Sequence, residues 1–131
     1  MGTDSVLLAD FVRLPGNCRV ADLGSGCGTL GLLLCAEDET CKVTGIELSQ
    51  QAHLAAVENI EKNLLEGRLS SLHGDVREIR GLLPAGSFDC VISNPPYFPV
   101  GTGKQAQGPL GQARSEETLS LSQLAEAAAW L

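Results

Sequence analysis

The fold of this 131-residue chain is decided by the stretch Val20-Ala21-Asp22-Leu23-Gly24-Ser25-Gly26-Cys27-Gly28. A short apolar segment runs into three glycines at alternate positions, and a helical pattern follows from Thr29 to Ala36. A strand, a glycine-rich turn and a helix in this order let a ligand approach the backbone and meet a helix N-terminus. The stretch therefore predicts an α/β fold with a ligand site at the end of this strand.

Two classes of cofactor fit the glycine-rich turn. Residues 26–31 match the dinucleotide pattern G-x-G-x-x-G, and Glu47 follows about 20 residues later, as that pattern requires. Asp22, however, would repel a pyrophosphate and attract a cation. S-adenosylmethionine carries a sulfonium and an ammonium group and no phosphate, so the sequence favours it. Glu47 ends the predicted strand 42–47, where it either accepts from both ribose hydroxyls or is simply solvated.

A third acidic residue follows the next predicted strand. Residues 69–73 are expected to form this short strand, and Gly74-Asp75 lies at its carboxyl end. There Asp75 could accept a hydrogen bond from the adenine amine of the cofactor, and the Val76 N–H could donate to the ring. Gly-Asp is also common in turns, so a plain turn is the alternative. Three successive strands thus have an acidic residue at or just past their carboxyl ends.

The fourth predicted strand, residues 88–93, ends in Asn94-Pro95-Pro96-Tyr97. The prolines have no N–H to donate, so the segment offers a stiff row of acceptors. The Asn94 side-chain oxygen and the Pro95 carbonyl together can accept both hydrogens of one NH2 group, while Tyr97 offers a ring face. The segment predicts a clamp for an amide or a nucleobase amine, and a proline-rich turn is the alternative.

These four motifs, in this order, resemble those of the class I Rossmann-like methyltransferases that act on exocyclic or amide nitrogens. The resemblance implies an α/β fold with a doubly wound, mostly parallel sheet, and S-adenosylmethionine as the cofactor. It implies cofactor contacts at Asp22, Gly24, Ser25, Gly26, Gly28, Glu47, Leu48, Asp75, Val76 and Asn94. It further implies a catalytic segment made of Asn94, Pro95, Pro96 and Tyr97. No nucleophilic residue is required, because the protein need only hold the acceptor nitrogen in line with an activated methyl group.

Within that family, the chain looks most similar to the bacterial tRNA1(Val) adenine-N6 methyltransferases. The features that carry this resemblance are Thr3-Asp4 before an apolar helix, Phe98 after the clamp, and Ala113-Arg114 with Glu116 past a glycine-rich loop. The resemblance implies methylation of N6 of an adenine in tRNA, with Tyr97 stacked on the flipped base. Enzymes that methylate a glutamine of peptide-chain release factors share the clamp, as do DNA adenine methyltransferases. A noncatalytic cofactor-binding fragment is the alternative from another class.

The segment after the clamp is locally positive. Between Asp89 and Glu116 there is no acidic residue, but there are two basic residues, Lys104 and Arg114. Together with Tyr97 and Phe98, these two basic residues are the expected substrate contacts. The net charge of −7 argues mildly against broad nucleic-acid binding, and a flexible connector is the alternative for this loop.

The composition is that of one domain, residues 1–131, with 44% hydrophobic residues. No apolar run reaches the ~20 residues of a membrane span and no secretory leader is evident, so a cytoplasmic protein with no membrane partner is expected. Five cysteines without C-x-x-C spacing predict free thiols and no metal site. His53 and His73 are expected to be isolated residues with no catalytic role.

The pattern of elements alternates between strands and helices. Strands are predicted at 19–23, 42–47, 69–73 and 88–93, and helices at 4–14, 28–38, 50–65 and 76–82. The third helix is expected to turn Val57, Ile60 and Leu64 inward and to stop at Gly67. A last helix should begin at a Ser120/Gln123 capping box, with Leu119 and Leu124 as its hydrophobic staple, and bury Leu121, Leu124, Ala128 and Leu131.

The sheet of the family has seven strands, and this sequence supplies four. We therefore expect a domain truncated after the fourth strand and its helix. The fourth strand would then be an unpaired apolar edge through which the isolated fragment self-associates.

Overall fold

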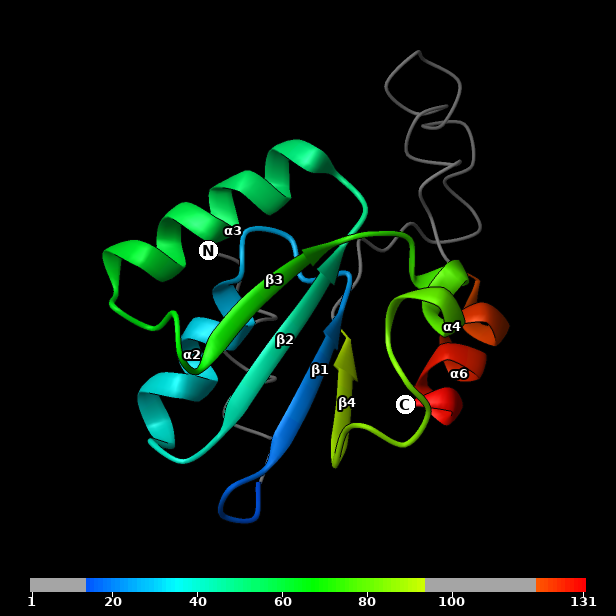
Figure 1. Ribbon diagram of the computed structural model, residues 1–131, viewed down its shortest axis with the longest axis horizontal. Coiled ribbons are helices and arrows are strands. Elements are labelled where there is room, and N and C mark those ends of the chain that lie inside the picture. Colours follow the sequence, from blue (N-terminus) through cyan, green and yellow to red (C-terminus); the bar gives the residue numbers. More distant parts are fainter. Residues whose placement is uncertain (1–13, 94–119) are drawn as a thin grey trace, which may run out of the picture.

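A computed structural model describes residues 14–93 and 120–131 of the chain (Figure 1). Its strands are β1 (Arg19–Leu23), β2 (Lys42–Glu47), β3 (Leu69–His73) and β4 (Cys90–Ser93). Its helices are α2 (Thr29–Glu37), α3 (Gln50–Lys62), the 3-10 turn η1 (Val76–Glu78), α4 (Ile79–Leu82) and α6 (Leu121–Trp130). The alternation predicted from the sequence is confirmed.

The four described strands form one parallel sheet in the order β3-β2-β1-β4. The chain starts in the middle at β1, moves outward to β3, and then returns to the other side of β1 for β4. All four arrows in Figure 1 point the same way, so the carboxyl ends of the strands share one edge of the sheet. In open parallel sheets, ligands bind at this edge, close to the point where the strand order reverses.

Helices cover both faces of the sheet, as the doubly wound prediction requires. Helices α2 and α3 pack on one face, around a core that includes Val20, Val43 and Leu69. The other face is covered by η1, α4 and α6, over Leu23 and Ile46. Both faces of the central strands are therefore buried, which is why Val20, Ala21 and Leu23 of β1 are all apolar without alternation. Each fully buried aliphatic side chain contributes about 1.5–3 kcal/mol.

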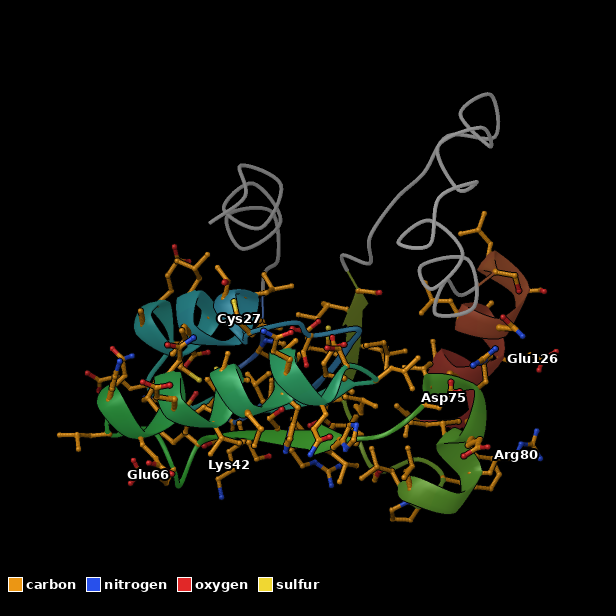
Figure 2. All side chains as sticks on the ribbon, turned by 90° about the horizontal axis from the view of Figure 1, so that it is seen from above. Cys27, Lys42, Glu66, Asp75, Arg80 and Glu126 are labelled. Carbon is orange, nitrogen blue, oxygen red and sulfur yellow. The ribbon has the colours of Figure 1, made fainter. Side chains whose placement is uncertain are left out.

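The last helix begins where the sequence predicts. The Ser120 hydroxyl accepts the Gln123 N–H at 3.1 Å, and the Gln123 side-chain oxygen accepts the Ser120 N–H at 3.0 Å. The other end of α6 is tied to α4, because the Trp130 indole N–H donates to Leu83 O at 2.8 Å. The Arg80 guanidinium also lies 4.8 Å above the centre of the Trp130 ring, and Figure 2 shows Arg80 on the outer side of α4. The two Trp130 contacts fix the end of α6 against α4.

Several element details differ from the prediction. Helix α3 ends at Lys62, because Leu64 takes a left-handed backbone with φ 56° and is 85% exposed instead of turned inward. Strand β4 begins at Cys90, two residues later than predicted. In α6, Leu121 is 84% exposed and Ala127 is buried in its place. The predicted helix 4–14, except Leu14, and Leu119 of the staple lie outside the described residues.

The five cysteines are free thiols, as predicted. Cys18, Cys35 and Cys41 are buried in the core that underlies α2, and burial raises the pKa of the Cys35 thiol to about 11. Thiols that hold their proton at neutral pH are poor nucleophiles and poor metal ligands. Cys27 is the exposed member of the set and lies at the start of α2 (Figure 2).

Candidate functional site

The glycine-rich turn after β1 depends on backbone conformations that favour glycine. Gly24, Gly26 and Gly28 have φ values of 75°, 59° and 89°, in the left-handed region where other residues are strained. The N–H groups of Gly24 and Ser25 both donate to Ile46 O, at 2.8 and 3.1 Å. The turn is therefore fastened to the neighbouring strand β2, and it leads into α2 at Gly28.

The Glu47 carboxylate fixes the same turn from the end of β2. Its Oε1 accepts the Gly26 N–H at 2.6 Å, and its Oε2 accepts the Ser49 N–H at 2.8 Å. An ionised carboxylate has about four acceptor positions, so these two bonds leave room for two more. Glu47 is thus already oriented, and its remaining acceptor capacity matches a ribose diol.

Asp22 is a buried carboxyl group at the end of β1. It is 2% exposed, and burial, aided by the charge of Glu47, raises its pKa to about 7. Asp22 pairs with Gly45 on the neighbouring strand, two residues before Glu47. Two carboxyl groups under one glycine-rich turn favour a cationic ligand and oppose a phosphate. This arrangement supports the cation-binding interpretation over the dinucleotide one.

Asp75 lies at the same edge, just past β3, but the structure shows it already paired. Its carboxylate accepts the Arg77 N–H at 2.9 Å and the Arg77 guanidinium at 2.6 Å. The hydrogen bonds from Arg77 lower the pKa of Asp75, so the group is charged at neutral pH. Val76 is buried at the start of η1. An adenine contact at Asp75 would have to use the acceptor capacity that Arg77 leaves free.

Sequence reasoning missed the role of Gly45. A Cβ atom at this position would lie 2.5 Å from Ser25 Oγ and 2.6 Å from Ser25 Cβ, so the turn packs directly on the bare backbone of β2. Ser25 Oγ is buried and has no hydrogen-bond partner among the described residues. A glycine inside a strand often marks such a close approach, and this signal was available in the sequence.

Two residues of α3 also support the turn. The Asn59 side-chain amide donates to Cys27 O at 3.0 Å, and Ala56 lies 3.5 Å from the position of a Cβ at Gly28. No sequence motif marks Asn59, since its partner is a backbone carbonyl 32 residues away. The glycine-rich turn is thus held by β2 from one side and by α3 from the other.

The clamp and the expected substrate contacts lie outside the described residues, which leave out 94–119. Asn94 through Tyr97, Phe98, Lys104 and Arg114 therefore stay predictions. Ser93, the last residue before them, pairs with Leu23, and its hydroxyl donates to Leu23 O at 2.7 Å. Strand β4 thus ends beside the start of the glycine-rich turn.

The prediction that His53 and His73 are isolated is wrong. Their rings stack with centroids 5.5 Å apart and planes 19° from parallel. This contact joins α3 to β3, and it could not be seen before the two elements were placed side by side. In the described parts of the chain, no three His, Cys, Asp or Glu side chains are grouped to hold a metal ion, and no helix is long and apolar enough to cross a membrane.

Comparison with known families identifies the family of the chain. The family model "Methyltransferase small domain" matches residues 2–113. The chain belongs to this family. In this methyltransferase small domain, Asp22 and Glu47 lie at the carboxyl edge of the parallel sheet, where open α/β sheets bind ligands.

Curated relatives of this methyltransferase small domain are similar over nearly its whole length. Two of them, from Shewanella sediminis and Citrobacter koseri, are named tRNA1(Val) (adenine(37)-N6)-methyltransferase. They are 36% and 35% identical in alignments of 131 and 130 residues. These alignments cover 97% and 98% of this chain and 52% of each relative. The chain therefore spans about half the length of the curated relatives that it matches.

Solved structures show the same fold. A predicted O-methyltransferase from Agrobacterium tumefaciens is 34% identical, with a TM-score of 0.63 over 71% of this chain and 49% of that one. A geranyl diphosphate C-methyltransferase from Streptomyces coelicolor, solved with S-adenosyl-L-homocysteine, has a TM-score of 0.61 at 15% identity, over 70% of this chain and 34% of that one. The second likeness concerns the fold alone. Both agree with a Rossmann-like fold.

Proposed function

We propose that this chain is the cofactor-binding part of an S-adenosylmethionine-dependent methyltransferase that acts on N6 of an adenine in tRNA. The observation that carries the proposal is the pair of carboxyl groups, Asp22 and Glu47, beneath and beside the glycine-rich turn. A negative site of this kind suits a ligand with two cationic groups and a ribose diol. It opposes NAD and other pyrophosphates.

The names of the relatives support the choice of substrate. Those reported above act, by name, on adenine 37 of tRNA1(Val), and they are similar to nearly all of this chain. The Asn-Pro-Pro-Tyr segment at 94–97 offers acceptors for an exocyclic amine and a ring for stacking. A tRNA substrate would place the reaction in the cytoplasm, as the sequence predicts.

In the proposed mechanism the chain positions its reactants and forms no covalent intermediate. S-adenosylmethionine supplies the activated methyl group when bound. Transfer of this methyl to N6 of the adenine would release S-adenosylhomocysteine and one proton, and the chain would hold the adenine amine in line with the methyl. The Asn94 side-chain oxygen and the Pro95 carbonyl would each accept a hydrogen bond from one N–H group of the amine, and this would favour a pyramidal, nucleophilic nitrogen. Positioning of this kind contributes about 7–11 kcal/mol.

The experiment is methyl transfer from labelled S-adenosylmethionine by the full-length protein. The acceptors are a tRNA1(Val) transcript, the same transcript with adenine 37 replaced by guanine, and a peptide-chain release factor. We expect label in the first transcript alone, and loss of the label by orders of magnitude in the Asn94→Ala variant. Label in the release factor would show that the protein methylates a glutamine side chain instead. No transfer to any acceptor would support a noncatalytic fragment.

A further inference from the structure

The turn between β2 and α3 is held from the side by the end of β3. The Gly74 N–H donates to Glu47 O at 2.9 Å, and His73 Nε2 lies 3.0 Å from Leu48 O. A backbone carbonyl accepts and does not donate, so His73 carries its proton on Nε2. The end of β3 therefore supplies two donors to consecutive carbonyls of the turn.

One peptide unit connects His73 to the Glu47 carboxylate. Leu48 C=O and Ser49 N–H belong to the same planar peptide group. The His73 ring binds the oxygen of this peptide group, and the Ser49 N–H of the same group donates to Glu47 Oε2 at 2.8 Å. If this peptide plane rotates, the Ser49 N–H moves away from Glu47. The His73 ring thus acts on the orientation of the Glu47 carboxylate through a rigid unit.

The His73 ring is itself held in place by α3. It stacks on the His53 ring, with centroids 5.5 Å apart, and His53 Nδ1 lies 2.8 Å from the Ser71 hydroxyl. Ser71 and His73 are both on β3, so the stack joins one face of the strand end to the helix that follows the turn. An exposed side chain would otherwise sample several rotamers, and ordering it costs entropy. The stack reduces that cost.

We propose that His73 is a positioning residue for the nucleoside half of the cofactor. It holds the peptide plane that orients Glu47 toward the ribose hydroxyls. This inference rests on the proposed function, because it presumes that the ligand is an adenosine compound. The donor on Nε2 is the required feature, so a glutamine, whose Nε2 is also a donor, is expected to replace it.

The test measures calorimetric binding of S-adenosylhomocysteine and of adenosine by the full-length protein and three variants. His73→Ala should weaken both ligands by about three- to tenfold, the range of one hydrogen bond. His73→Gln should stay within about twofold of wild type. Ser70→Ala is the matched control, because the Ser70 hydroxyl bonds Thr44 on the same two strands without touching the turn, and it should bind both ligands normally. In turnover, His73→Ala should raise KM for the cofactor and leave kcat unchanged.

The outcomes separate this inference from the proposed function. If wild type and His73→Ala bind S-adenosylhomocysteine equally well, the positioning role of His73 is overturned, while the proposed methyltransferase function stands. Equal losses in His73→Gln and His73→Ala would overturn it too, since packing of the ring would then be its role. If wild type binds neither ligand, both proposals fail. A readout on unmodified protein is nitrogen NMR of His73, which should show the Nε2–H tautomer, and the Nδ1–H tautomer would contradict the inference.

Discussion

Asp22 combines deep burial with an acidic side chain, and this combination has a cost in the unliganded protein. The pKa of Asp22 is about 7 in the folded chain, against 3.8 as its ordinary value. Between these two values the folded protein keeps a proton that the unfolded chain releases. The free energy of unfolding should therefore fall as the pH rises from about 4 to 7 and become level above that.

The Asp22→Asn variant tests this cost. Without a titrating group at this position, the variant should be more stable than wild type by roughly 2–4 kcal/mol at pH 8 and about equal to it at pH 4. Urea denaturation of the unliganded protein at both pH values measures the difference. The same variant should bind S-adenosylmethionine poorly, because the cation loses its counter-charge. A stability difference that is independent of pH would show that Asp22 is not the titrating group.

Glu47 serves the glycine-rich turn and, in our proposal, the ribose. Glu47→Ala should lower the affinity for S-adenosylmethionine by about 1–3 kcal/mol, because the ribose hydroxyls lose an acceptor and the Gly26 and Ser49 N–H groups lose their partner. Calorimetry measures the loss. Glu66→Ala is the matched control, since Glu66 is exposed and lies between α3 and β3, away from the site (Figure 2). Equal affinities in the two variants would remove Glu47 from the site.

At the scale of elements, the contact between the glycine-rich turn and β2 sets the site. Gly45→Ala would place a Cβ 2.5 Å from Ser25 Oγ, so the turn must move. We expect a loss of about 1–3 kcal/mol in stability and a clear loss of cofactor affinity. Adding Ser25→Gly should restore most of the stability, because the clashing side chain is gone. Thermal unfolding and calorimetry give both values.

Gly67→Ala is the control for this series. No atom lies within 4 Å of a Cβ at Gly67, so this change should leave stability and binding nearly unaltered. If Gly45→Ala behaves like Gly67→Ala, the turn is free to move and the close approach does not position the cofactor.

Features of the fold that depend on local sequence could be predicted, whereas contacts between distant segments could not. Strand β1 and the turn after it follow from local signals, an apolar run and glycines at fixed spacing, and three of the four strands were predicted with their observed bounds. The end of α3 was not, because apolar spacing placed Leu64 inward while the backbone had already left the helix. The Ser25–Gly45 approach and the His53–His73 stack join segments far apart in sequence, so no local pattern encodes them.

At the scale of the whole molecule, the parallel sheet gathers residues from separate segments at one edge. Asp22 and Glu47 lie at the carboxyl ends of β1 and β2, and Asp75 lies just past the adjacent β3. Lys42, at the start of β2, lies at the opposite end of the sheet (Figure 2). Acidic residues spaced by 25 or more positions could therefore be predicted to act together, because a parallel sheet was inferred first and brings the ends of its strands to one edge. Among the described strands, β4 and β3 are the edges, and self-association of residues 1–131 through β4 stays a prediction.

The central claim is that the carboxyl-edge site takes a cationic adenosine cofactor instead of a pyrophosphate. Calorimetric titration of the full-length protein with S-adenosylmethionine, and separately with NADH, tests it most directly. We expect saturable binding of S-adenosylmethionine that tightens as the pH rises from about 6 to 8, where Asp22 becomes ionised, and no detectable binding of NADH. Binding of NADH with no binding of S-adenosylmethionine would contradict it.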